Sequence, residues 1–244
     1  MLKLPDRLSI KRDKKGEARL VEKARAWVTK DGRTPGIHAS ELLDPRKAYW
    51  SRVDPKELSN RLVNTFLVGR VLHAFVINAV DGTKSLAIDG TDQGTRTCEE
   101  LGIEWSPDFF IKGKVRELKT SRAYYEPKTV EDLAMYAEQT LVYMAATNTL
   151  EGQVWVLFLN FKDEDKRTSP EWRVYTISIT QDDLDQFKQA IKITRKALLS
   201  ALKVNSDEKL PPCREWLRSK KMCDWWGQCA CSKEKDKEKK DSDE

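Results

Sequence analysis

The sequence predicts an α/β protein, with a mixed β-sheet flanked by helices and a cysteine-rich C-terminal appendage. Apolar residues recur at helical spacing from Pro55 to about Ala79 and again from Gln181 to Lys203. The mostly apolar segment VWVLFLNF at 154–161 is typical of a buried strand, and the alternating WRVYTISIT at 172–180 is typical of a half-buried one. Four of the five cysteines fall within the last 32 residues, which sets that segment apart.

The first part of the chain predicts helices broken by prolines. Residues 1–35 are polar, and we expect loop there apart from a short helix near Ala18–Thr29. Ser40 is expected to cap a second helix over Glu41–Val53. Pro45 interrupts that helix unless it lies in the first turn, where proline is tolerated.

The middle of the chain changes to a strand pattern. SLAIDGT at 85–91 and WSPDFFIKGKVRELKTS at 105–121 predict short strands joined by turns that contain glycine. Thr129–Thr147 returns to a helical pattern, and KDEDKRTSPE at 162–171 predicts an exposed loop. The last helix has an apolar stripe made of Leu184, Phe187, Ile191, Thr194, Leu198, Ala201 and Leu202.

Composition divides the chain into four regions. We expect a basic N-terminal arm at 1–35, a core at 36–203, a cysteine-rich segment at 204–231 and a disordered charged tail at 232–244. Residues 1–33 hold eleven Lys or Arg and five Asp or Glu, which suits either a polyanion partner or a solvated arm. The longest strictly apolar run is too short to span a membrane, so we expect a cytoplasmic protein without a membrane partner.

The segment around Gly113 carries the clearest chemistry. Glu117 and Lys119 are two residues apart on a predicted strand and therefore share a face. A hairpin turn at Gly113 would bring Asp108 close to Glu117. Two carboxylates suit Mg²⁺ or Mn²⁺, and a nearby ammonium can position a water for phosphodiester hydrolysis. The alternative is an ordinary exposed Glu–Lys pair on a strand.

These residues resemble the PD-(D/E)XK nuclease superfamily, through Pro107-Asp108 followed, after eight intervening residues, by Glu117-Leu118-Lys119. Three further segments are similar to its RecB-like branch. They are Gly69–His73 (Gly-x-x-x-His), Gln139–Tyr143 (Gln-x-x-x-Tyr) and Ser40–Tyr49, where the branch usually has Ser-x-x-x-Cys-Pro-Arg. The resemblance extends to the CRISPR-associated iron–sulfur exonucleases, their viral homologues and the nuclease domains of recombination helicases, and it implies a restriction-endonuclease-like fold.

The resemblance also implies roles for individual residues. The catalytic Mg²⁺ or Mn²⁺ would be held by His73, Asp108, Glu117 and the carbonyl of Leu118. Lys119 would activate or orient the attacking water, and Gln139 and Tyr143 would orient Lys119 or contact DNA. The alternatives are a core histidine at His73, a core aromatic at Tyr143 and a surface residue at Gln139. Phosphates of the DNA backbone would be neutralised by Arg46, Lys47, Arg116 and Arg122.

The clustered cysteines favour a metal or cluster site over disulfides. They are Cys213, Cys223, Cys229 and Cys231. Relatives with a [4Fe–4S] cluster use one N-terminal and three C-terminal cysteines, whereas this chain has Asp44 at the N-terminal position. Three arrangements follow: the four thiolates form a self-contained site, Asp44 is an unusual alternative ligand, or the cluster is lost. The resemblance favours iron–sulfur, with zinc as the alternative and free cysteines in a tryptophan-rich lid as the plainest interpretation.

The function implied by the resemblance is a metal-dependent DNA nuclease. We expect an exonuclease on single-stranded DNA or duplex ends, with little sequence preference because backbone contacts carry no sequence information. Two rival hypotheses use the same fold. One is a catalytically idle DNA-binding adaptor, and the other is a nuclease subunit active only within a larger DNA-processing complex.

Overall fold

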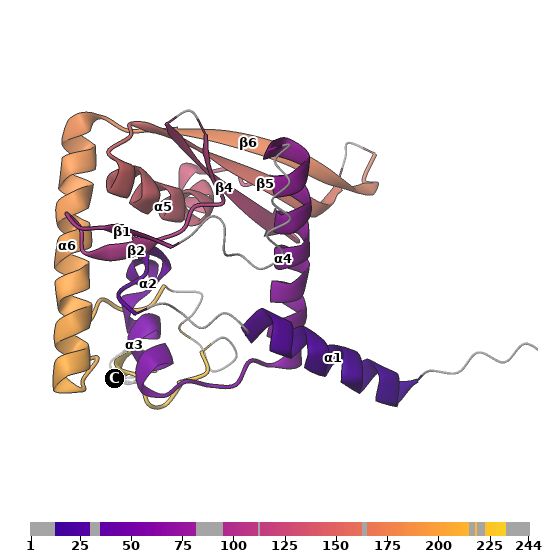
Figure 1. The fold of residues 1–244 in the computed structure, drawn as a ribbon, viewed down its shortest axis with the longest axis horizontal. Helices are drawn as coiled ribbons and strands as arrows, with labels where there is room; N and C mark the ends of the chain where they lie inside the picture. The colour runs from indigo at the N-terminus through magenta and orange to yellow at the C-terminus, as the bar shows by residue number, and fades with distance from the viewer. Residues whose placement is uncertain are drawn as a thin grey trace, which may run out of the picture. The chain divides into compact units, whose positions relative to one another are not determined.

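The structure, a computed structural model, describes residues 13–29, 35–81, 95–111, 113–162, 165–214, 218 and 223–232 (Figure 1). The chain divides into two compact units, one made of residues 1–33 and 57–72 and the other of residues 34–56 and 73–244. The cysteine-rich segment thus belongs to the larger unit together with the sheet. The predicted tail at 232–244 lies outside the described residues except for Ser232.

The smaller unit contains α1 (Lys14–Thr29) and the first part of α4 (Asn60–Asp81). Helix α1 starts four residues before the predicted Ala18. The Arg70 side chain donates a hydrogen bond of 2.8 Å to the carbonyl of Trp27 and stacks over the indole at 5.3 Å. Helix α4 starts at Asn60 and not at the predicted Pro55, and residues 55–59 are not helical.

The predicted helix over Glu41–Val53 is two helices, α2 (Ala39–Leu43) and α3 (Pro45–Val53). Pro45 has no backbone N–H and cannot continue a helix from α2, but it is well suited to the first position of α3. The predicted cap at Ser40 is wrong, because the N-cap of α2 is His38. The backbone N–H of His38 donates to Glu41 Oε2 at 2.8 Å, which fixes this end of the helix.

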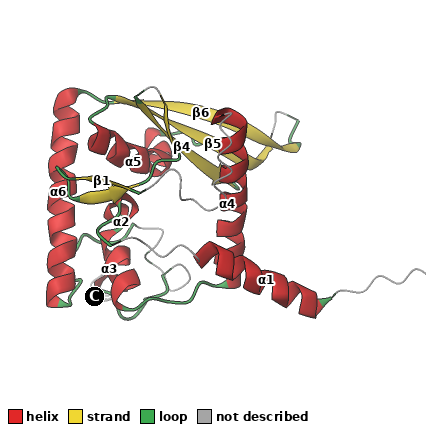
Figure 2. Ribbon diagram, in the orientation of Figure 1, coloured by secondary structure: helices red, strands yellow, loops and turns green. Residues whose placement is uncertain are grey.

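The larger unit contains a four-stranded mixed sheet, which lies at the top of the view in Figure 2. Its strands, in spatial order, are β3 (Phe109–Ile111), β4 (Lys114–Ser121), β5 (Glu151–Lys162) and β6 (Thr168–Ser178). The β3–β4 and β5–β6 pairs are antiparallel, and the β4–β5 pair is parallel. The parallel pair is joined by helix α5 (Val130–Thr147), as such connections require. The predicted mixed sheet flanked by helices is therefore confirmed.

Two short strands form a second sheet, and the connection between β5 and β6 is shorter than predicted. The antiparallel pair β1 (Arg96–Cys98) and β2 (Ile103–Trp105) forms a separate two-stranded sheet. The loop predicted at 162–171 is shorter than expected, because β5 ends at Lys162 and β6 starts at Thr168, while residues 165–170 are exposed as predicted. The strand predicted at 85–91 lies outside the described residues.

Helix α6 (Gln181–Val204) runs along one side of the larger unit (Figure 1). The Thr180 hydroxyl accepts from the N–H of Asp183 at 3.2 Å, and Asn205 ends the helix with a left-handed conformation. Four positions of the predicted apolar stripe are buried, namely Leu184, Ile191, Leu198 and Ala201. Helix α6 packs against α2 and α3, which precede the sheet in the chain, and against α5, which joins its two parallel strands.

Side-chain alternation along β4 sets what faces each side of the sheet. Val115 packs with Val142 and Tyr143 of α5 in the main core. On the other face, Leu118 packs with Phe109 and with Val76, which belongs to the last part of α4. Glu117 and Lys119 share the parity of Val115 and so point toward α5. In the described part of the chain no helix is long and apolar enough to cross a membrane.

Candidate active site

The centre of the site is the pair Glu117 and Lys119 on β4. The Lys119 ammonium donates to Glu117 Oε1 at 2.5 Å and to Gln139 Oε1 of α5 at 2.7 Å. Glu117 is only 3% exposed, which excludes the interpretation of an exposed strand pair. The predicted shared face of Glu117 and Lys119 thus points into the interface between strand and helix.

Gln139 and Tyr143 extend this network along α5. They lie four residues apart and share one helix face, and the Gln139 amide donates to the Tyr143 hydroxyl at 2.5 Å. Tyr143 is buried, and its pKa is raised by burial and further by the negative charge of Glu117. Tyr143 therefore stays a neutral phenol. Its hydroxyl accepts from the Gln139 amide nitrogen, and this contact directs the amide oxygen of Gln139 toward Lys119.

Asp108 and His73 form the other half of the site. The register pairs Phe109 with Arg116, so Asp108, one residue before β3, lies beside Glu117. Asp108 Oδ2 accepts from the N–H of Leu118 at 2.7 Å, and its Oδ1 lies 3.1 Å from His73 Nδ1. Burial acts to lower the pKa of His73, but the hydrogen bond and charge of Asp108 outweigh it and raise that pKa.

One carboxylate oxygen of Glu117, Oε2, is buried without a hydrogen bond among the described residues. Burial, helped by the nearby charge of Asp108, raises the pKa of Glu117 to about 7. A buried carboxylate with an orphaned oxygen is stabilised by a proton or by a cation.

The donor types fit a hard divalent cation. Carboxylate oxygens, an imidazole nitrogen and a backbone carbonyl are ligands that Mg²⁺ or Mn²⁺ accepts. His73 and Asp108 now bond to each other, and no three His, Cys, Asp or Glu side chains in the described ranges are arranged to hold a metal ion. The fit therefore rests on the identity of the donors and on the unpartnered Oε2 of Glu117.

Of the four residues predicted to contact DNA phosphates, two are exposed and two are placed elsewhere. Lys47 and Arg122 are exposed, as such contacts need. Arg46 does not suit the role, because it is 1% exposed and its guanidinium is held inside the protein. Arg116 follows the opposite parity to Glu117 and Lys119, and its Nε donates to Gln153 at 3.2 Å on the other sheet face.

The four C-terminal cysteines come together next to α3. Cys229 and Cys231 are each 1% exposed, and all four thiols are free. The pKa of Cys213 is raised by burial and then by Cys231, Cys229 and Cys223, so these sulfurs lie close enough to repel as thiolates. The pKa of Cys223 is likewise raised by burial and then by Cys229.

Asp44 is occupied elsewhere. Its carboxylate lies 3.4 Å from Arg214 Nε, and Arg214 also pairs with Glu138 of α5. Burial raises the pKa of Asp44, against the effect of Arg214. Asp44 is thus paired with Arg214, and the four-cysteine ligand set stays a prediction, because no three His, Cys, Asp or Glu side chains in the part of the chain that the structure describes are arranged to hold a metal ion.

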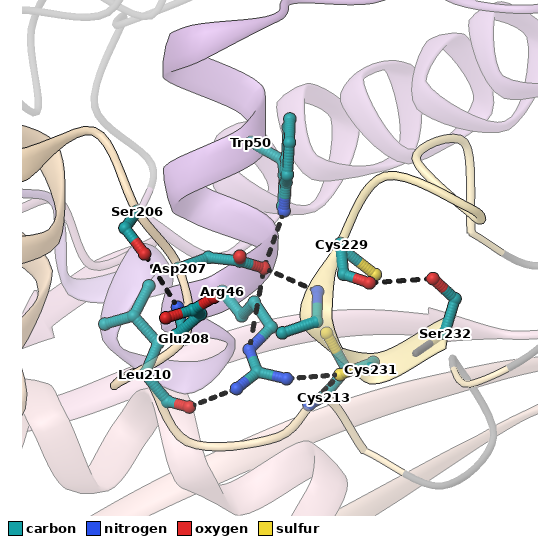
Figure 3. A network of polar contacts seen from close by, with 11 residues as sticks. Arg46, Trp50, Ser206, Asp207, Glu208, Leu210, Cys213, Cys229, Cys231 and Ser232 are labelled. Carbon is teal, nitrogen blue, oxygen red and sulfur yellow. Dashed lines mark hydrogen bonds and ion pairs between the residues drawn. The ribbon is translucent and has the colours of Figure 1, made fainter. Parts of the chain in front are cut away.

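A buried polar network anchors the cysteine segment to α3 (Figure 3). Arg46 Nη1 donates to Cys231 Sγ at 3.0 Å, and Arg46 Nη2 donates to the carbonyl of Leu210 at 2.5 Å. The Asp207 carboxylate lies 3.8 Å from Arg46 Nε and accepts from the indole of Trp50 at 2.9 Å. The N–H of Cys213 also donates to Cys231 Sγ, at 3.1 Å.

Trp225 of this segment has a structural contact. Trp225 is 6% exposed and donates from its indole to the carbonyl of Asp54 at 2.8 Å, so it packs and does not form an exposed lid. Asp207 has no counterpart among the residues predicted from sequence, since a lone aspartate in a loop carries no spacing signal.

Comparison of this chain with protein-family models, curated proteins and solved structures found no match. The functional argument therefore rests on the geometry of the site itself. That geometry joins five side chains from three elements and one loop into one network, namely His73, Asp108, Glu117, Lys119 and Gln139.

Proposed function

We propose that this protein is a metal-dependent deoxyribonuclease of the PD-(D/E)XK superfamily, in its RecB-like branch, with a restriction-endonuclease-like core. The observation that carries the proposal is the buried Glu117, which has an ammonium on one carboxylate oxygen and no partner on the other among the described residues. Asp108 and His73 stand beside it. His73, Asp108, Glu117 and Lys119 lie in segments that resemble the family motifs, and these segments follow one another in the same order as in the family.

Lys119 has the central role in the proposed reaction. Two of its three N–H groups have partners within the described residues, Glu117 and Gln139. These two contacts fix the direction of the third N–H, which would hold the attacking water or a phosphate oxygen. The ammonium would also offset negative charge that develops on the phosphate as the water attacks in line.

Gln139 and Tyr143 act as positioning residues in this scheme. The buried phenol of Tyr143 accepts from the Gln139 amide, and this contact keeps the amide oxygen directed at Lys119. A bound cation would be held by His73, Asp108, Glu117 and the carbonyl of Leu118. When bound, it supplies the positive charge that lowers the pKa of a water and stabilises the phosphorane-like transition state.

The substrate is proposed to be single-stranded DNA or duplex ends in the cytoplasm, cut as an exonuclease. Exposed Lys47 and Arg122 would contact phosphates and give strong dependence on salt with little dependence on sequence. The four cysteines would hold a [4Fe–4S] cluster, or zinc in its place, as a structural site. Absorbance spectra and metal analysis distinguish the two, and an Asp44→Ala variant should retain the bound metal.

The proposal is tested by cleavage of end-labelled linear and circular single-stranded DNA in Mg²⁺, Mn²⁺ or EDTA. Lys119→Ala and Asp108→Ala should each lose about 10²-fold or more of the metal-dependent rate. Lys114→Ala is the matched control, because Lys114 lies on the same strand but is not part of the network. Its ammonium lies 2.5 Å from Glu151 Oε2. An uncut circle with a degraded linear strand identifies an exonuclease.

Other outcomes would redirect the assignment. Lys119→Ala at the wild-type rate with an intact fold would refute the active site. DNA binding that is insensitive to EDTA, without cleavage in any metal, would favour the idle adaptor. Activity restored only by a partner protein would favour a subunit of a larger DNA-processing complex.

A further inference from the structure

We propose that Tyr124, Tyr125 and Lys162 form a base-stacking platform for single-stranded DNA beside the proposed active site. This inference rests on the proposed function, because it assigns a binding subsite for the substrate of that site. Tyr124 and Tyr125 are 51% and 58% exposed, which is unusual for two consecutive large aromatic side chains. Neither residue belongs to the network of Glu117 and Lys119.

The two rings surround one cation. Lys162 Nζ lies 4.8 Å from the centroid of Tyr124 and 5.9 Å from that of Tyr125. Such contacts hold rings and ammonium in a defined arrangement while leaving the outer ring faces open to solvent. Aromatic faces next to a cation are the combination that binds nucleobases and phosphates of single strands.

The backbone beneath the platform is fixed by hydrogen bonds. The N–H of Lys162 donates to the carbonyl of Tyr124 at 2.8 Å, which joins the loop to the end of β5. Glu126 accepts from the hydroxyl of Tyr175 at 2.9 Å and from Arg173 Nε at 3.2 Å. The loop is therefore held at both ends of the tyrosine pair, so little ordering is needed when a ligand binds.

Charged side chains of both signs lie near the platform in the sequence. Arg122, Lys128, Lys162 and Arg173 are cations, the acidic run 163–165 follows Lys162, and the other two carboxylates are Glu126 and Glu171. Both carboxylates pair with Arg173, Glu126 at 3.2 Å and Glu171 at 2.8 Å. Repulsion of a phosphate by these carboxylates is thus reduced.

The platform lies directly after the strand that carries the active site. Tyr124 is five positions after Lys119, which limits their Cα atoms to about 18 Å apart in the most extended chain. A single strand stacked on the tyrosines would therefore have its backbone within a few nucleotides of Lys119. Duplex DNA has its bases already stacked on one another, and they are closed to these rings.

Fluorescence anisotropy of labelled oligothymidylate in EDTA tests the platform, because no strand is cut during the measurement. The Tyr124→Ala/Tyr125→Ala variant should bind about 5- to 150-fold more weakly for each ring removed. The double phenylalanine variant keeps both rings and should bind as the wild type does. Lys162→Met should reduce the slope of log K against log salt concentration by about 0.7.

Two controls separate stacking from general effects. An abasic strand of equal length keeps the phosphates but has no bases, so wild type and the double alanine variant should bind it equally. Trp172→Ala removes an aromatic side chain that is 44% exposed and points away from Arg173 and Tyr175, and it should leave binding unchanged. Equal weakening of abasic and oligothymidylate binding, or no weakening by the alanine variant, would overturn the platform.

The same experiment distinguishes the two proposals. Tyrosine-dependent binding without cleavage in any metal would leave the platform standing and refute the nuclease. Metal-dependent cleavage by wild type and the double alanine variant, with equal binding of oligothymidylate, would refute the platform alone.

Discussion

Replacing Arg46 gives opposite results for the two roles that this residue could have. As a phosphate contact, Arg46→Ala would weaken DNA binding and leave the fold intact. In the structure its guanidinium is 1% exposed and donates to Cys231 Sγ and to the carbonyl of Leu210. We therefore expect the main effect to be a loss of folding stability.

The size of this loss follows from what Arg46→Ala leaves behind. Asp207 is 7% exposed and keeps two donors, the indole of Trp50 at 2.9 Å and the N–H of Ala230 at 3.0 Å. It loses its cationic neighbour, and breaking a buried ion pair typically destabilises by about 3 to 5 kcal/mol. The retained donors place the expected loss near the lower end, at about 3 kcal/mol.

Urea unfolding followed by tryptophan fluorescence measures this loss as a shift of the midpoint at constant slope. Arg46→Met, which keeps the volume of the side-chain stem, is the variant to use if the alanine protein does not fold. Lys47→Ala, exposed on the same helix, should change stability by less than about 0.5 kcal/mol. The reasoning is refuted if Arg46→Ala is as stable as Lys47→Ala.

Three further predictions follow from the site and its surroundings. Because the folded-state pKa of Glu117 is raised from 4.5 to about 7, metal-free wild type should lose stability relative to Glu117→Gln as the pH rises through this interval, and urea titrations at several pH values check this. Mg²⁺ at about 100 times its Kd should stabilise the wild type by about 2.7 kcal/mol, seen as a raised Tm that Glu117→Gln lacks. Gly102 has φ +64°, and a Cβ added there would lie 2.7 Å from Arg195 Cζ, so Gly102→Ala should destabilise by about 1 to 2 kcal/mol, whereas Gly69→Ala in open space on α4 should stabilise by about 0.8 to 1 kcal/mol. Equal urea midpoints for these two glycine variants would contradict the argument.

The parts of the fold that the sequence can predict are those with a long periodic pattern. Helix α6 and strand β5 lie within a few residues of their predicted positions, because their apolar residues repeat over many positions. The β1–β2 pair escapes prediction, since three residues are too few to show a period. The sequence does not decide whether Pro45 interrupts one helix or begins a second. The outcome depends on whether His38 and Glu41 form the start of a separate helix before Pro45.

The candidate site is predictable where local spacing sets geometry. Two residues on a strand share a face and four residues on a helix share a face, which brings Glu117 to Lys119 and Gln139 to Tyr143. The same parity rule, applied to Arg116, places it on the other face. The burial of Arg46 is not predictable, because its partners lie more than 160 residues away in the sequence.

That separation affects how the protein is made. The guanidinium of Arg46 bonds to Cys231, a residue 185 positions later in the chain. At a synthesis rate of about 5 to 20 residues per second, α3 has to wait about 10 to 40 s on the ribosome before its partner exists. During that interval α3 and its Arg46 are already synthesised, whereas the cysteine that Arg46 contacts in the folded protein is not.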